Sequence, residues 1–176
     1  YFMKHVLKPF LVVLLAASCI VYSCNQESTN DYSTLTISLT DNPGNYDNVF
    51  VEVVGVEVHT DGNGWESMPV DTAVYDLLTL RNGVDTVLVT PQSLPSGRIS
   101  QVRLLLGDSN SVVVAGTTYP LSLSSQDETG LKCNVNAILQ PNTAYQLMLD
   151  FDADQSVLQT GNGTYKLKPV VSAFFQ

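Results

Sequence analysis

The segment Thr34-Leu35-Thr36-Ile37-Ser38-Leu39-Thr40 decides the fold class of this chain. Its aliphatic residues alternate strictly with threonine and serine, which is the pattern of a strand with one buried face and one solvated face. The next four residues, Asp41-Asn42-Pro43-Gly44, supply turn chemistry, because proline fixes φ and glycine tolerates positive φ. We therefore predict a strand over residues 34–40 that ends in a reversal of the chain.

The next apolar run, residues 48–60, changes phase once. Val49, Val51 and Val53 share one face, whereas Val54, Val56 and Val58 follow in the opposite phase. A slip of one residue turns every later side chain to the other face of a sheet. We predict a β-bulge at Val53-Val54-Gly55, where glycine can take unusual backbone angles. In that register both Glu52 and Glu57 point to water.

The rest of the chain is a series of short apolar runs between glycine and proline turns. Gly-Asn-Gly occurs at 62–64 and again at 161–163, and both are strong hairpin signals. Further strands are expected at 65–68, 74–80, 84–89, 99–106, 111–115, 117–121, 131–139, 145–151 and 164–172, with room for single-turn helices near 76–80 and 154–159. This spacing predicts an all-β protein, a single antiparallel β-sandwich of immunoglobulin or transthyretin type.

The alternation also predicts the core. The side chains expected to face inward are Val102, Leu104 and Leu106, then Cys133, Val135, Ala137 and Leu139, and finally Tyr145, Leu147, Leu149 and Phe151. Cys133 should therefore be a buried thiol that behaves as a small apolar residue rather than as a nucleophile.

Composition excludes several classes of protein. The chain has 176 residues, of which 44% are hydrophobic and 14% charged, with a formal net charge of -9. That length suits one domain, and the apolar fraction is too high for a wholly disordered chain. A nucleic-acid partner is not expected, because phosphate binding needs clustered lysine and arginine.

Residues 1–23 are predicted to be a signal peptide. Lys4 and Lys8 precede an apolar run over 10–17, which is shorter than the roughly 20 residues of a spanning helix. The following Val21-Tyr22-Ser23-Cys24-Asn25 resembles the lipobox of bacterial lipoproteins. The resemblance implies cleavage before Cys24 and acylation of that cysteine. Cleavage before Cys19, or an ordinary cleaved signal without lipid, are the alternatives.

The polar stretch that follows, residues 24–32, is interpreted as a flexible tether between the lipid and a domain over 33–176. An acylated Cys24 leaves Cys133 without a partner for an intramolecular disulfide. The expected location is the cell envelope, lipid-anchored, either facing the periplasm or on the surface of the outer membrane.

Several longer strings resemble domain-of-unknown-function family 4382 over nearly the whole chain after the tether. They are LTISLTDNPGNYDNVFVEVVGVEVH, YDLLTLRNGVDT, LPSGRISQVRLLLGDSNSVVV, GLKCNVN and YQLMLDFDADQSV with GNGTYKLKPVV. Members of that family look like exported or lipid-anchored bacterial β-sandwich proteins of the Bacteroidetes type, and the family carries no assigned activity. Within these strings, Leu94-Pro95-Ser96-Gly97 is similar to the turn that enters a strand in transthyretin-like domains.

Asp150, Asp152 and Asp154 are candidates for a cation site. If the strand over 145–151 continued, these three carboxylates would crowd one face and repel one another unless a cation such as calcium or a base such as Arg103 neutralised them. The loop lacks the glycine and glutamate of an EF-hand. The simpler interpretation is solvated carboxylates, with Asp152 bound to backbone amides where the strand turns. No metal or other cofactor is expected.

A hydrolase would need Ser109, in Gly107-Asp108-Ser109, to meet His59, the single histidine after the signal. The chain has neither a Gly-x-Ser-x-Gly elbow nor a predicted helix after the serine. We interpret the block as a hairpin turn and expect a protein that is not an enzyme.

Thr72 and Thr86 lie in Asp-Thr-Ala and Asp-Thr-Val, which resemble the bacterial O-glycosylation motif of Bacteroidetes, so both could carry glycans. Trp65 and Tyr46, beside glycine-rich turns, could stack on sugar rings, or could pack on the core.

These observations favour a non-catalytic cell-envelope lipoprotein, a binding or accessory module that displays loops to a glycan, peptide or protein. The alternatives are a structural subunit of a surface assembly, joined by edge-strand pairing, and, with less support, a hydrolase.

Overall fold

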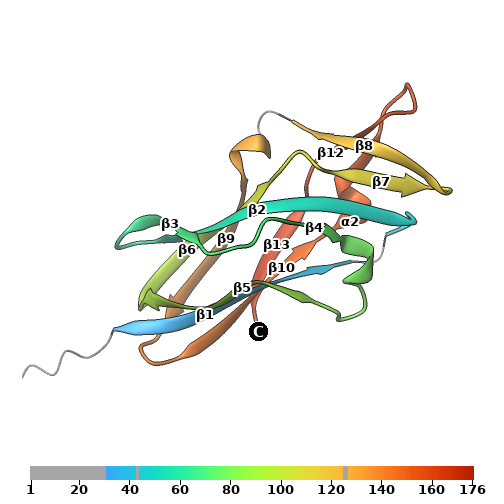
Figure 1. The fold of residues 1–176 in the computed structure, drawn as a ribbon. Coiled ribbons are helices and arrows are strands. Elements are labelled where there is room, and N and C mark those ends of the chain that lie inside the picture. The colour runs from blue at the N-terminus through green and yellow to red at the C-terminus, as the bar shows by residue number, and fades with distance from the viewer. Residues whose placement is uncertain (1–30, 43, 125–126) are drawn as a thin grey trace, which may run out of the picture.

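Two β-sheets face each other across one apolar core (Figure 1). The computed structural model describes residues 31–42, 44–124 and 127–176. The prediction of an all-β sandwich is confirmed. The predicted signal peptide, Cys24 and the tether as far as residue 30 lie outside the described residues. No helix in the described part of the chain is long and apolar enough to cross a bilayer.

The smaller sheet has four strands in the order β13-β10-β1-β5. Their bounds are β1 Tyr32–Asp41, β5 Thr86–Pro95, β10 Ala144–Phe151 and β13 Val171–Phe175. β1 and β10 pair in parallel, from Thr34 opposite Ala144 to Asp41 opposite Phe151. The antiparallel sandwich expected from the sequence is therefore a mixed one, because alternation within a strand does not depend on the direction of its neighbour.

The larger sheet is built on the long strand β2, Asn48–Thr60. The other strands are β3 Gly64–Met68, β4 Ala73–Asp76, β6 Gly97–Leu106, β7 Ser111–Val114, β8 Thr117–Leu123, β9 Leu131–Leu139, β11 Val157–Gln159 and β12 Tyr165–Leu167. β2 pairs with β4 and β3 in succession and also with β7 and β6 in succession. β9 extends the sheet beyond β6, and β8 leads to β12 through a second parallel pair.

The predicted bulge in β2 is confirmed. The register against β6 shifts between Val53, opposite Leu106, and Gly55, opposite Leu105. Val53 and Val56 are buried, whereas Val54 between them is 41% exposed. A Cβ at Gly55 would lie 2.9 Å from the Leu105 side chain, so the close approach explains the glycine.

A single-turn helix forms near each of the two segments where the sequence left room for one, and each follows an aspartate. β4 ends at Asp76, and the 3-10 helix η2, Leu77–Thr79, takes the remainder of the strand that was expected over 74–80. The Asp76 carboxylate accepts the Leu78 N–H at 3.2 Å and so caps this turn. The helix α2, Ala153–Ser156, follows β10 in the same way, with Asp152 at its cap. A further 3-10 turn, η3, covers Asp127–Thr129.

The predicted core residues face inward. Leu35, Ile37, Leu39, Val102, Leu104, Leu106, Leu139, Leu147, Leu149 and Phe151 are all buried, while Tyr145, Val135 and Ala137 are half-buried against them. Burial of each large aliphatic or aromatic side chain contributes about 1.5–3 kcal/mol. Cys133 is a free, buried thiol, and burial raises its pKa.

Candidate binding face

The outer surface of β3, β2, β6 and β9 carries a set of polar and aromatic side chains, which we call the polar face. Its members are Trp65, Glu57, His59, Gln101, Arg103, Lys132 and Asn134. They lie on this side because the intervening residues, such as Val58, Val102 and Cys133, point into the core. The hairpin of β2 and β3 thus lies beside β6 and β9, which come later in the chain (Figure 1).

Arg103 is fixed on this face by two contacts. Its guanidinium lies 4.0 Å from the centroid of the Trp65 ring, and its Nη1 donates to Glu57 Oε2 at 2.7 Å. The Arg103 and Glu57 side chains are only 19% and 20% exposed. A half-buried pair of this kind is stronger than a surface ion pair, because water screens it less. Glu57 and Glu52 both lie on the outer side of β2, as expected, but neither is fully solvated. Glu57 binds Arg103, and Glu52 is half-buried and accepts the Ser109 N–H at 2.9 Å.

Trp65 is not an open stacking platform. The Arg103 guanidinium covers its ring, and the ring of His59 meets it edge-on with centroids 5.1 Å apart. The tryptophan is half-buried but does not belong to the core cluster. Its role in the structure is to support the arginine, which presents a planar guanidinium above the ring.

Lys132 supplies the remaining positive charge of the polar face. It lies opposite Arg103 on β9, is exposed, and has its Nζ 5.8 Å from the Trp65 centroid. Arg98, nearer the start of β6, has a carboxylate partner, since its guanidinium lies 3.9 Å from Asp61. Among the described side chains Lys132 has no ion pair.

A row of amide and imidazole groups crosses the same face. Gln101 Nε2 donates to Asn134 Oδ1 at 2.8 Å, and His59 Nδ1 lies 2.8 Å from Ser100 Oγ. Cross-strand bonds of this length hold the side chains in fixed directions while leaving further donors and acceptors to solvent.

The chain between β8 and β9 bounds one end of the polar face. A Cβ on Gly130 would lie 2.7 Å from Cδ of Arg103 and 2.6 Å from the side chain of Leu105, so this backbone rests directly on both. Gly130 also has a φ of 94°, in the region that favours glycine. The backbone therefore limits where the Arg103 side chain can lie.

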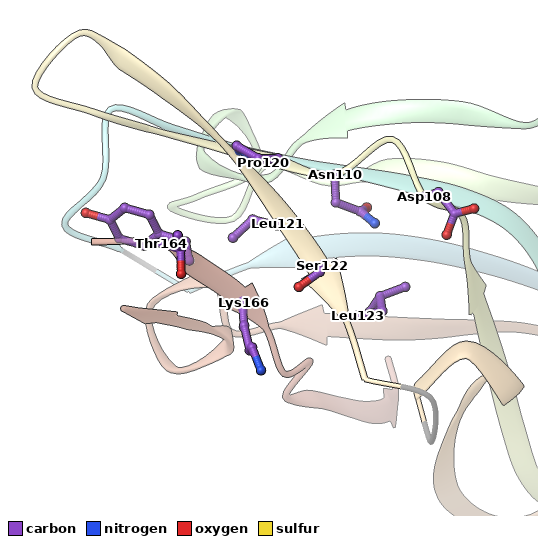
Figure 2. A pocket seen from close by; sticks show the side chains of 9 residues that line it. Asp108, Asn110, Pro120, Leu121, Ser122, Leu123, Thr164 and Lys166 are labelled. Atoms are coloured by element: carbon purple, nitrogen blue, oxygen red, sulfur yellow. The ribbon is translucent and has the colours of Figure 1, made fainter. Parts of the chain in front are cut away.

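A hollow of about 410 Å³ lies at the other branch of the larger sheet, around β8 and β12. Figure 2 shows Asp108 and Asn110 on one side of β8, with Thr164 and Lys166 on the other. Its most buried polar residue, Asn110, is already satisfied, because it accepts the Glu52 N–H at 2.9 Å and donates to the Gly107 carbonyl at 2.6 Å. This hollow offers a ligand only the exposed ends of a few side chains.

The three aspartates that were candidates for a cation site each have a different hydrogen-bond partner. β10 ends at Phe151, and the Asp152 carboxylate accepts the Gln155 N–H at 2.9 Å at the cap of α2. Asp150 instead accepts from Asn42 at 3.1 Å, and Asp154 accepts the Asn45 N–H at 3.3 Å. The interpretation of Asp152 as a backbone acceptor is confirmed. In the described part of the chain, no group of three or more His, Cys, Asp or Glu is placed to hold a metal.

Asp41 is the unusual carboxyl at this end of the sandwich, and sequence reasoning treated it only as a turn residue. It is 5% exposed, its Oδ1 accepts the Ala153 N–H at 2.9 Å, and its Oδ2 has no partner. Burial raises its pKa from 3.8 to about 7. The bond from Ala153 and the charge of Arg81 lower it, and Asp152 and Asp150 raise it further.

The remaining candidate residues lie apart from one another. His59 bonds Ser100 near one end of β6, whereas Ser109 follows the other end, so no serine–histidine pair forms between them. The block around Ser109 is a bend between β6 and β7. These strands both pair with β2 rather than with each other, so the prediction of a hairpin turn is wrong. Arg103 binds Glu57 and none of Asp150, Asp152 and Asp154, so that predicted pairing is also wrong.

Tyr46 packs against the core, and its hydroxyl donates to the Val157 carbonyl at 3.3 Å, which fits the core-packing interpretation. Thr72 is exposed between β3 and β4, and Thr86 is half-buried at the start of β5. An exposed loop position is the more accessible of the two for a modifying enzyme.

The fold and the polar face together define an all-β sandwich domain with a structured polar surface on one sheet. The chain belongs to the family described as Domain of unknown function (DUF4382), whose model matches residues 32–169. No curated protein and no solved structure matches the chain.

Proposed function

We propose that this chain is a non-catalytic binding module of the cell envelope, anchored by a lipid on Cys24, that presents the polar face to a glycan, peptide or protein. The observation that carries the proposal is the arrangement of Trp65, Arg103 and Glu57. A guanidinium is held between a tryptophan ring at 4.0 Å and a carboxylate at 2.7 Å on the outer side of the larger sheet.

Such an arrangement suits recognition. Binding sites are strongest where the recognising group is held in place before the ligand arrives, because less conformational entropy is lost on binding. Arginine and tryptophan are also the residue types that contribute most often to binding energy. The core does not require these side chains, since they lie outside the buried cluster.

The position of the anchor is compatible with this role. The described chain enters the domain at Tyr32, the start of β1 in the smaller sheet, and the polar face lies on the larger sheet (Figure 1). A lipid on Cys24 would be joined to β1 by the polar residues 25–31, which have the composition of a flexible linker.

Two measurements test the proposal. In membrane fractions of cells that express the full chain, the wild type should partition into detergent, whereas Cys24→Ser should not. On arrays of glycans and peptides, the wild type should give ligands whose signal is lost in Trp65→Ala and kept in Lys168→Gln, a charge removal at an exposed position away from the face. Ligands that bind both variants equally would contradict the assignment of this face.

A further inference from the structure

We infer that the polar face takes a saccharide that carries a carboxylate, such as a uronic acid within a glycan. The inference rests on the proposed function, since it names the class of ligand for the same face. Its basis is the distribution of charge and amide groups over β6 and β9.

The positive charges of this chain are few, and several of them lie on two neighbouring strands of the larger sheet. The whole chain has eight lysine and arginine residues against seventeen aspartate and glutamate residues. Three of those eight, Arg98, Arg103 and Lys132, lie on the adjacent strands β6 and β9. Glu57 and Asp61 each pair with one of the two arginines. The unpaired charge of the face is therefore positive and is located at Lys132, in contrast to the acidic remainder of the molecule.

The neighbours of Lys132 fit the rest of a sugar ring. Asn134 follows two residues later on the same side of β9, about 7 Å along the strand. Gln101 lies opposite Asn134 and donates to it at 2.8 Å. Side-chain amides offer a donor and an acceptor in one plane, which matches neighbouring hydroxyls. A carboxylate at Lys132 would thus place the hydroxyls of the same sugar residue near Gln101 and Asn134.

A single unpaired cation also sets the kind of anion that fits. A polyphosphate or a nucleic acid gains its affinity from many cations along its backbone. In the described part of the polar face the other cation, Arg103, is already bound by Glu57, and Arg98, nearer the start of β6, lies 3.9 Å from the Asp61 carboxylate. An isolated carboxylate needs one lysine at its charged group and polar groups around it. The arginine stacked on Trp65 adds a flat, weakly hydrated surface beside that site.

The test compares charged and neutral forms of the same sugars. The full chain in detergent is titrated calorimetrically with galacturonate, glucuronate and mannuronate oligosaccharides and with their carboxyl-reduced neutral counterparts. At least one acidic oligosaccharide should bind at least about tenfold more tightly than its neutral form, because a charge-assisted bond to Lys132 is lost on reduction. Raising the salt concentration should weaken the binding of the acidic oligosaccharide and leave the binding of its neutral counterpart unchanged.

Matched variants assign the effect to the face. Lys132→Gln should bring the two affinities within about twofold of each other, whereas Lys168→Gln, which removes an exposed lysine elsewhere, should leave the difference intact. Equal binding of charged and neutral sugars, or an undiminished difference in Lys132→Gln, would overturn the inference. If the neutral sugars still bind in a Trp65-dependent manner, the proposed function stands without it. If none of these sugars binds, the inference fails, and the array experiment then decides the proposed function independently.

Discussion

Gly130 is the residue on which the position of Arg103 depends. A Cβ at this position would lie 2.7 Å from the arginine side chain, and the substituted residue would have to keep a φ of 94°. We expect Gly130→Ala to lower the free energy of unfolding by about 2–5 kcal/mol, the sum of overpacking and backbone strain. It should also shift the emission of Trp65, the single tryptophan of the chain.

Gly64 provides the matched control. Its φ is 78°, but a Cβ there would meet nothing within 4 Å. Gly64→Ala should therefore cost only the strain of the left-handed backbone, about 1–2 kcal/mol. Urea unfolding of both variants measures the difference. Equal losses of free energy of unfolding would show that the Arg103 side chain moves aside for the added methyl group without cost.

Asp41 should make stability depend on pH. Its pKa is raised from 3.8 to about 7 in the fold, mainly by burial, so the folded state binds a proton more tightly than the unfolded chain. The contribution of Asp41 to the free energy of unfolding should therefore be largest below about pH 4. It should fall by up to about 4 kcal/mol as the pH rises to about 7.

Asp41→Asn removes that titration while keeping an oxygen that can accept the Ala153 N–H. We expect the variant to unfold at a higher urea concentration than the wild type at pH 8 and to show a flatter profile between pH 4 and 7. Asp150, whose pKa is also raised by burial, should leave part of the pH dependence of stability in this variant. Asp85→Asn, at an exposed position, should keep the wild-type profile. A wild-type profile in Asp41→Asn would exclude this carboxyl as the source.

Asp41 and Arg103 show which residue contacts cannot be predicted from the sequence. The residues after Asp41 are Asn, Pro and Gly, which predict only that Asp41 belongs to a turn. Its burial depends on α2, more than one hundred residues further along the chain, which covers it and donates the Ala153 N–H. Arg103 was correctly placed on the outer face, but its partner Glu57 depends on the register between β2 and β6.

At the scale of elements, β10 is the strand whose packing should matter most in the smaller sheet. It lies between β1 and β13, and Leu149 at its centre is 0% exposed. We expect Leu149→Ala to lower the free energy of unfolding by about 2–5 kcal/mol, through lost burial and the cavity left behind. The measurement is the urea midpoint at an unchanged slope.

Leu158 on β11 is the corresponding exposed leucine, at 45% exposure. Leu158→Ala should change the free energy of unfolding by no more than about 0.5 kcal/mol. A comparable loss in both variants would mean that β11 packs more closely than its exposure indicates.

The elements that could be predicted are those defined by local chemistry. The bulge in β2 follows from the phase change at Val53 and Val54, and Asp152 was expected to accept backbone amides where β10 ends, as it does at the cap of α2. The parallel pairing of β1 with β10 could not be predicted in this way. Both strands alternate, and neither sequence contains information about the direction of a partner so distant along the chain.

At the scale of the whole molecule, the strand edges favour a monomer over a surface assembly built by edge pairing. β3, β4 and β11 are short, and Asn136 in β9 has a φ of 49° that distorts that edge. β9 also packs beside β13, where the Cys133 thiol donates to the Val171 carbonyl. Short and irregular edges of this kind give a second chain little to pair with.

β5 is the remaining long edge strand, and Pro91 hinders its pairing with a second chain. Among the described strands, β5 pairs only with β1, and its register shifts where Pro91 lies, between Val89 and Gln92. Proline cannot donate to a neighbouring strand, so it blocks pairing along the free side. We expect the wild type to elute as a monomer at high concentration and Pro91→Val to form dimers or larger species that increase with concentration. Light scattering after gel filtration measures this, with Pro141→Val, in the turn before β10, as the control. Self-association of the wild type itself would favour the structural-subunit alternative, because two chains would then associate even though the edge strands of both sheets are short, irregular or interrupted by proline.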